Sequence, residues 1–176
     1  MTPDTLSAQG QAAYDAEDYE TAVAAFRQAR QVWHEMGDPF GEAQAAMDEG
    51  RAHARFGNIE AAIEALSDAL KLFKECDALE EQAAVAMQLG QLMVQRGDYK
   101  RASELLAYAA QLFDELDDVE HANEVLATLE EAFGQQGDWL NRLIVRYYLM
   151  RRTGDDVSLS ARLLGLFLRL LGVSLS

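Results

Sequence analysis

Cysteine and proline are scarce in this chain of 176 residues, which contains one Cys and two Pro. Because Cys76 is the only cysteine, no intramolecular disulfide can form and nothing requires an oxidising compartment. The amino terminus lacks a basic stretch followed by an apolar run, so it does not look like a secretion signal. We therefore expect a cytoplasmic protein.

Positive charge is also in short supply. The chain has 15 Lys plus Arg against 30 Asp plus Glu, a formal net charge of -15. This balance argues against a nucleic-acid backbone or an anionic membrane as the partner of the main body. Two interpretations of the acidic surface stay open: it keeps the protein in solution, or it steers a basic partner.

Motifs for catalysis and metal binding are missing. The three histidines, His34, His53 and His121, are far apart, and the chain has no HExxH, CxxC or calcium loop. It also lacks a GxxxxGK phosphate loop and a GxSxG nucleophile elbow. We expect no metal, no cofactor and no catalytic residues, and predict that the protein is not an enzyme.

Helical periodicity accounts for almost all of the chain. Apolar residues recur at i, i+3, i+4 and i+7, no stretch alternates with period 2 for long enough to be a strand, and no linker rich in Pro or Ser divides the sequence. With 49% hydrophobic residues, this length suits one domain with an ample core. The sequence predicts an all-α fold.

An internal repeat organises the chain, and its best copy runs from Leu89 to Ala109. The same skeleton appears 40 residues earlier, more weakly at residues 10–29, and weakly again 40 residues later. The matching positions are Gly90, Gly97, Asp98, Tyr99, Ala102, Leu106 and Ala109 with Gly50, Gly57, Asn58, Ile59, Ala62, Leu66 and Ala69. Units that cannot bury their own apolar face predict a solenoid in which stacked neighbours share one core.

This pattern resembles the tetratricopeptide repeat (TPR), a pair of antiparallel helices, over roughly residues 4–152. The 40-residue period exceeds the commonest TPR length of about 34 residues, and is similar to that of kinesin light chains, Pins-type adaptors and bacterial TPR regulators. The resemblance implies a right-handed α–α superhelix of about four helix pairs. The repeats are expected at about 4–37, 38–77, 78–117 and 118–152.

Differences among the copies carry further expectations. Glu17 stands where the other copies have a turn glycine, so that turn is not expected to use a positive φ freely. In the fourth copy Glu130 replaces the crossing glycine, and Arg142 and Arg146 replace packing residues, which favours an end cap. Two sets of equivalent residues near the ends of the second helices, here called columns, are predicted to be packed core. The first column is Trp33, Phe73 and Phe113, and the second is Met36, Cys76 and Leu116. His53 occupies a packing position, so we interpret it as a core or boundary histidine.

In TPR proteins the first helix of each unit lines a concave groove. Carried over by position, that groove implies a partner-binding set of Tyr14, Met47, Arg51, Arg55, Met87, Gln91 and Gln95. Arg51 and Arg55 project together at i, i+4 and could grip a carboxylate, while the methionines would give an adaptable floor. Alternatively, both arginines pair with Asp48, Glu49 or acids of a neighbouring unit.

One binding mode of the family is not expected here. The clamp with which TPR co-chaperones hold an acidic chaperone tail uses lysines, arginine and asparagines. At the corresponding places this chain has Ser7, Gln11, Asp48, Ala84 and Gln88. The clamp is absent, although peptide binding in general is still expected.

The segment 155–176 departs from the repeat. Its non-apolar residues fall on one narrow helical stripe, so the leucine-rich face is wider than a surface helix needs. Three interpretations stay open: a cap on the solenoid, self-association through a face containing Leu164, Phe167, Leu168 and Leu171, or membrane contact. Arg162 and Arg169 argue against a membrane-spanning role, since each would cost about 2.5 to 3.5 kcal/mol near the bilayer centre.

The leading hypothesis is a non-enzymatic scaffold or adaptor that binds a protein or peptide ligand in the TPR groove. The rival is a self-assembling or membrane-associated structural component acting through its carboxy-terminal helix. A homo-oligomer is an expected possibility of the second hypothesis, and nucleic acid is a partner of neither.

Overall fold

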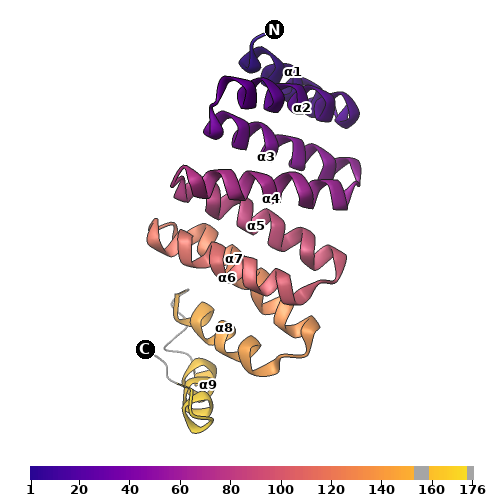
Figure 1. Ribbon diagram of the computed structural model, residues 1–176. Helices are drawn as coiled ribbons and strands as arrows, with labels where there is room; N and C mark the ends of the chain where they lie inside the picture. The colour runs from indigo at the N-terminus through magenta and orange to yellow at the C-terminus, as the bar shows by residue number, and fades with distance from the viewer. Residues whose placement is uncertain (153–158, 174–176) are drawn as a thin grey trace. The chain divides into compact units, whose positions relative to one another are not determined.

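The computed structural model describes residues 1–152 and 159–173, with side chains in the second range from Leu164 onward. All regular structure in these ranges is α-helical, and the predicted all-α helical repeat is confirmed (Figure 1). The helices are α1 (Pro3–Asp15), α2 (Tyr19–Met36), α3 (Pro39–Phe56), α4 (Ile59–Glu75), α5 (Leu79–Arg96), α6 (Tyr99–Glu115), α7 (Val119–Gln136), α8 (Trp139–Arg152) and α9 (Leu159–Leu170). Of the predicted segment 155–176, residues 155–158 and 174–176 lie outside the described residues.

The chain divides into two compact units, Met1–Leu92 and Met93–Ser176, and the division falls inside α5. In the first unit α1 packs on α2, α2 on α3, and α3 on α4. In the second unit α6 packs on α7, α7 on α8, and α8 on α9. Within each unit, these helices thus pack on the helix that follows them in the chain, as expected of stacked helix pairs.

Two kinds of turn join the helices. Turns of two residues, as between α3 and α4, begin with a glycine at positive φ, here Gly57 at 89°. Turns of three residues instead place a non-glycine residue at positive φ: Glu17 at 60°, Asp77 at 53° and Asp117 at 56°. The expectation that the turn at Glu17 would not use a positive φ freely is therefore wrong, because Glu17 itself adopts the left-handed conformation.

Aspartates begin most of the helices. Asp38 Oδ1 accepts a hydrogen bond from the Gly41 amide at 3.0 Å, and Pro39 occupies the first helical position. Asp98 and Asp118 cap α6 and α7 in the same way. Asp77 does not, because it takes the positive φ of its turn and α5 begins two residues later.

The crossing glycines allow helices to touch. A Cβ at Gly10 would lie 2.7 Å from Cε1 of Phe26, and a Cβ at Gly50 would lie 2.6 Å from Cγ of Leu66. Phe26 and Leu66 are each 1% exposed. The glycines therefore let the largest core side chains of the second helix lie directly on the backbone of the first.

One of the two predicted core columns is not core. Phe73 and Phe113 are buried, at 0% and 4% exposure, and Trp33 is half-buried. Met36 is 62% exposed and Leu116 is 39% exposed, while Cys76 is half-buried instead of fully buried. The second column falls in the last turn of the helix or at its C-cap, where no following helix covers it.

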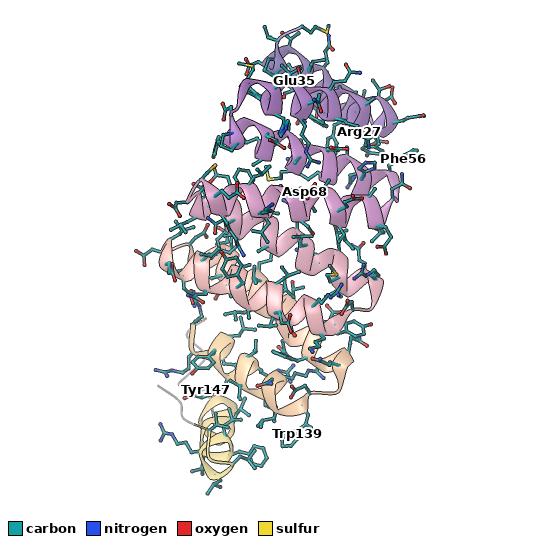
Figure 2. All side chains as sticks on the ribbon, viewed as in Figure 1. Arg27, Glu35, Phe56, Asp68, Trp139 and Tyr147 are labelled. Atoms are coloured by element: carbon teal, nitrogen blue, oxygen red, sulfur yellow. The ribbon has the colours of Figure 1, made fainter. Side chains whose placement is uncertain are left out.

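The carboxy-terminal helix α9 lies against α8. A Cβ at Gly165 would be 2.9 Å from the ring of Tyr147, and Leu168 is fully buried. Figure 2 shows Tyr147 on α8 next to α9. Glycine at this position again permits close approach of an aromatic ring to a helix backbone.

Candidate functional site

Two tyrosines and two arginines of the first unit form a cluster that we name the tyrosine–arginine cluster: Tyr14, Tyr19, Arg51 and Arg55. Tyr14 lies near the end of α1 and Tyr19 opens α2, so the intervening turn brings their rings edge to face with centroids 5.5 Å apart. Arg51 and Arg55 lie one turn apart on α3. The fold thus gathers side chains from three helices.

Each guanidinium group of the cluster lies over one tyrosine ring. Arg51 Cζ is 5.7 Å from the centroid of Tyr14, and Arg55 Cζ is 5.8 Å from that of Tyr19. Such cation–π contacts contribute about 0.5–1 kcal/mol at exposed sites and restrict the rotamers of a long side chain. Both arginines stay largely exposed. Their remaining N–H groups are thereby held in place for an acceptor.

The two arginines differ in their polar partners. Arg51 Nη1 lies 3.2 Å from Asp48 Oδ1, which matches the ion pair considered from the sequence. Arg55 instead donates to the Tyr19 hydroxyl from Nε and Nη2, both at a long 3.4 Å. These hydrogen bonds raise the pKa of Arg55, and burial raises the pKa of Asp48 against the opposing effect of Arg51. Arg55 is thus the more available cation.

The other predicted groove residues are placed as follows. Met47 is half-buried on α3, Met87 and Gln91 are half-buried on α5, and Gln95 is exposed. Gln95 belongs to the second unit, the others to the first. Contacts gather Tyr14, Arg51 and Arg55 only. Tyr19 was missing from the predicted set, although its place directly after the turn at Glu17 and Asp18 was visible in the sequence.

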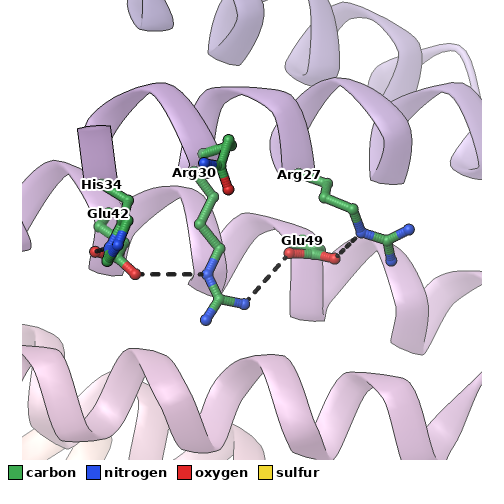
Figure 3. Close-up of a pocket in the computed structure, with 6 residues that line it drawn as sticks. Arg27, Arg30, His34, Glu42 and Glu49 are labelled. Carbon is green, nitrogen blue, oxygen red and sulfur yellow. Dashed lines mark hydrogen bonds and ion pairs between the residues drawn. The ribbon is translucent and has the colours of Figure 1, made fainter. Parts of the chain in front are cut away.

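A second polar site lies between α2, α3 and α4. Figure 3 shows Arg30 between Glu42 and Glu49, with Arg27 on the other side of Glu49. These side chains, with Gln31 and His34, line a hollow of about 370 Å³. Arg30 bridges three acids, with Nη2 2.6 Å from Asp68, Nη1 3.6 Å from Glu49 and Nε 4.0 Å from Glu42.

Glu49 and His53 form the buried base of this second site. Glu49 is 4% exposed and accepts a hydrogen bond from Arg27 Nε at 2.8 Å. Arg27 Nη2 lies 3.2 Å from His53 Nε2; because a guanidinium only donates, that nitrogen accepts and the ring proton is on Nδ1. Burial lowers the pKa of His53, and the predicted core or boundary position is confirmed at 7% exposure.

Within residues 1–152 and the described part of α9, no group of His, Cys, Asp and Glu is arranged to hold a metal. In the second site, Arg27 and Arg30 of α2 pair with Glu49 of α3 and Asp68 of α4, so these ion pairs link three helices.

The predicted carboxy-terminal association face is changed by the structure. Phe167 and Leu171 are exposed, Leu164 is half-buried, and Leu168 is fully buried. Leu168 is therefore removed from the exposed face, and Leu166 and Leu170 join it at 57% and 77% exposure. A helix rotates by about 100° per residue, so Leu164 and Leu168, one turn apart, share the covered face, whereas Leu166 and Leu170 share the exposed one. No described helix is long and apolar enough to cross a membrane.

Comparison with protein families gives two matches, both to models described as tetratricopeptide repeat. One covers residues 2–75 and the other residues 47–117. Residues 2–117 belong to the tetratricopeptide repeat family. The TPR matches end within the turn that precedes α7, so the fourth repeat expected at 118–152 stays a prediction.

Solved TPR-like structures share this fold at low sequence identity. The apo form of RapI matches with a TM-score of 0.79 and 15% identity, over 92% of this chain and 45% of that one. Aspartyl phosphate phosphatase F from Bacillus subtilis matches with a TM-score of 0.74 and 11% identity, over 90% of this chain and 42% of that one. Kinesin light chain TPR-like repeats from Podosopora anserina match with a TM-score of 0.67 and 17% identity, over 96% of this chain and 94% of that one. The chain thus spans less than half the length of RapI and of the phosphatase. Among curated proteins, none matches it in sequence.

Proposed function

We propose that this TPR protein is a non-enzymatic interaction module that binds a protein segment along the face carried by α1 and α3, with an acidic side chain of the partner on Arg51 and Arg55. The tyrosine–arginine cluster is the observation that carries the proposal. In a chain with net charge -15, two exposed guanidinium groups are held side by side on aromatic rings.

The physical advantage of such a cluster is pre-organisation. An arginine loses rotamer freedom when it grips a carboxylate, and that loss weakens binding. Stacking on Tyr14 and Tyr19 restricts the two side chains before the partner arrives. Arg55 has a tyrosine hydroxyl and no carboxylate as its hydrogen-bond partner, so a bidentate pair with an incoming acid need not break an existing ion pair.

The surrounding charge gives selectivity. The acidic surface repels acidic segments in general, so only a partner whose carboxylate reaches the cluster gains a net attraction. Met47, half-buried on the same helix, offers an adaptable apolar contact beside the arginines. The proposed ligand is therefore a segment with at least one acidic and one apolar side chain.

A peptide array tests the proposal. The wild-type protein is expected to retain acidic–apolar peptides, and the double variant Arg51→Glu with Arg55→Glu to lose them. Lys71→Glu with Lys100→Glu is the matched control, because these exposed lysines lie on α4 and α6 and the change in net charge is the same. Equal retention by the wild type and the arginine variant would sink the proposal, as would equal loss in both double variants.

A further inference from the structure

A crevice in the second unit has a mainly apolar lining. It lies among α6, α7 and α8, has a volume of about 680 Å³, and is lined by the apolar side chains of Ala107, Ala110, Leu126 and Leu129, with the ring of Tyr148. Gln111, Asp114, Glu115 and Arg152 also line it, and Arg152 Nη1 pairs with Asp114 Oδ1 at 2.6 Å. The lining is therefore mainly apolar, and its charged residues are two acids and one arginine.

The internal repeat explains how this crevice arises. It occupies the corresponding place in the second unit to the polar site between α2, α3 and α4 in the first, because five of the six residues that line that site, shifted by 80 positions, line the crevice. Across that shift Arg27 becomes Ala107, Arg30 becomes Ala110, Glu49 becomes Leu129 and Asp68 becomes Tyr148. Two arginines and their acids occupy these positions in the first site, whereas two alanines, a leucine and a tyrosine occupy them in the second, whose volume is larger.

The same unit also carries an apolar ridge. Leu166, Phe167, Leu170 and Leu171, here named the α9 ridge, are 57%, 46%, 77% and 45% exposed. Because they are exposed, the crevice of their own chain does not cover them. α9 is held on α8 through Tyr147 and Gly165, whereas the next residue, Tyr148, lines the crevice from another face of the same helix.

Charge makes a second copy the fitting occupant. Arg169 lies on the exposed side of α9 between Leu166 and Leu170, and it would meet a lining with two carboxylates and one guanidinium. We propose that the chain forms a two-fold dimer in which the α9 ridge of each copy is seated in the crevice of the other. A two-fold axis makes both contacts at once and closes the assembly, so no filament grows from unpaired patches.

This inference is independent of the proposed peptide binding. The crevice and the α9 ridge lie in the second unit, whereas the tyrosine–arginine cluster lies in the first. Failure of one leaves the other intact, because the dimer is measured by mass and the peptide site by retention on an array.

Light scattering coupled to size exclusion, with the full chain over a range of concentrations, tests the dimer. The wild type is expected to show the mass of two chains. Leu166→Ser with Leu170→Ser is expected to raise the dissociation constant at least tenfold. Ala107→Arg is expected to raise the dissociation constant by a similar factor, because it introduces at an exposed position of the crevice the arginine that the first unit has at the equivalent position, Arg27. Met36→Ser with Leu79→Ser, exposed apolar residues of the first unit, is the control and is expected to change nothing.

Mixing the two interface variants makes the test specific. Neither variant forms a good contact with itself, but in the mixture the intact ridge of Ala107→Arg meets the intact crevice of the serine variant. The mixture is therefore expected to associate at least several-fold more tightly than either variant alone. Arg169→Glu should weaken the dimer, and Glu115→Lys in the same chain should restore part of the loss.

Three results would overturn the inference. A monomer at every concentration removes the dimer. A dimer that is lost with the serine variant but unaffected by Ala107→Arg shows ridge-to-ridge pairing. A monomer whose binding to vesicles of phosphatidylcholine and phosphatidylglycerol disappears in the serine variant shows that the ridge meets a membrane instead.

Discussion

Glu130 Oε1 lies 3.1 Å from Nη2 of Arg146, and the same oxygen lies 3.4 Å from Nε of Arg142. In the second repeat the three corresponding positions are Gly50, Leu66 and Ala62, in which the glycine packs directly on the leucine. One apolar contact has thus been replaced, position for position, by an ionic one. The sequence showed the three substitutions separately, and the structure shows that they compensate for one another.

This compensation predicts coupling between Glu130 and Arg146. Each side chain is partly exposed, with Arg146 at 52%, so a double-mutant cycle with Glu130→Gln and Arg146→Gln is expected to give a coupling free energy of about 0.5 kcal/mol. Urea unfolding measures it. Additive effects of the two substitutions would show that the pair contributes nothing to stability.

Gly50→Ala is expected to destabilise the first unit by about 1–3 kcal/mol, since the new Cβ would meet Leu66 Cγ at 2.6 Å. This loss outweighs the gain of up to about 1 kcal/mol in helix propensity. The denaturant midpoint of the full chain measures the effect. A matched comparison is Gly50→Ala in a Leu66→Ala background, where the clash with Leu66 is gone and only the 3.2 Å approach to the Ala62 carbonyl oxygen remains, so a smaller loss is expected. Destabilisation of equal size in both backgrounds would contradict the packing explanation.

Glu17→Gly is expected to stabilise the protein by about 0.5–1 kcal/mol. Glu17 has φ 60°, a conformation that costs an L residue roughly 1–2 kcal/mol. Glycine removes this cost, but part of the gain is offset because glycine loses more conformational entropy on folding. Thermal unfolding measures the change. Glu20→Gly, in the first turn of α2, is the control and is expected to destabilise by about 0.5–1 kcal/mol.

His53 makes stability depend on pH. Burial holds its folded pKa below the unfolded value of about 6.5, so between the two values the unfolded chain binds more protons. Stability is therefore fully present above about pH 6.5 and is lost as the pH falls through that window. The positive charge of Arg27 beside Nε2 adds to this effect of burial, whereas Glu49 Oε1, 3.7 Å from the same nitrogen, opposes it. Denaturant midpoints measured across this window are expected to fall with pH in the wild type and less steeply in His53→Gln.

His121 provides the opposite sign in the same protein. The hydrogen bond to Asp118 raises the pKa of His121, so its contribution is present below about pH 6.5 and is lost as the pH rises through the folded pKa. An NMR titration of the imidazole resonances measures both groups at once. The pKa of His53 is expected below the ordinary value of a histidine and the pKa of His121 above it. The reverse order would contradict the burial of His53 and the pairing of His121 with Asp118.

Local chemistry was enough to predict much of the fold. The recurrence of Gly57 and Gly97 marks the turns, Asp38 and Pro39 mark a helix start, and the 40-residue spacing marks the repeat. These signals lie within a few residues of the structure they specify, so they can be read without knowing what packs on what.

The candidate sites depended on contacts that local signals do not contain. The sequence placed Arg51 and Arg55 together because they are one turn apart, but Tyr19 joins them across 36 residues of chain. Similarly, Arg27 and Glu49 are separated by 22 positions, and no periodicity in the sequence pairs them. Long-range polar partners are chosen by geometry after packing, since many acids are available to each arginine in a chain this acidic.

The sequence by itself determined the all-α repeat, the turns and the helix lengths, because each follows from backbone conformational preference and the period of apolar residues. Only the tertiary structure decided which apolar residues are covered. Leu168 is buried while Leu166 and Leu170 are exposed, and Met36 is exposed although Phe73 and Phe113 are core. The physical reason is that burial is a property of two surfaces, so a side chain's own chemistry cannot say whether a neighbouring helix reaches it.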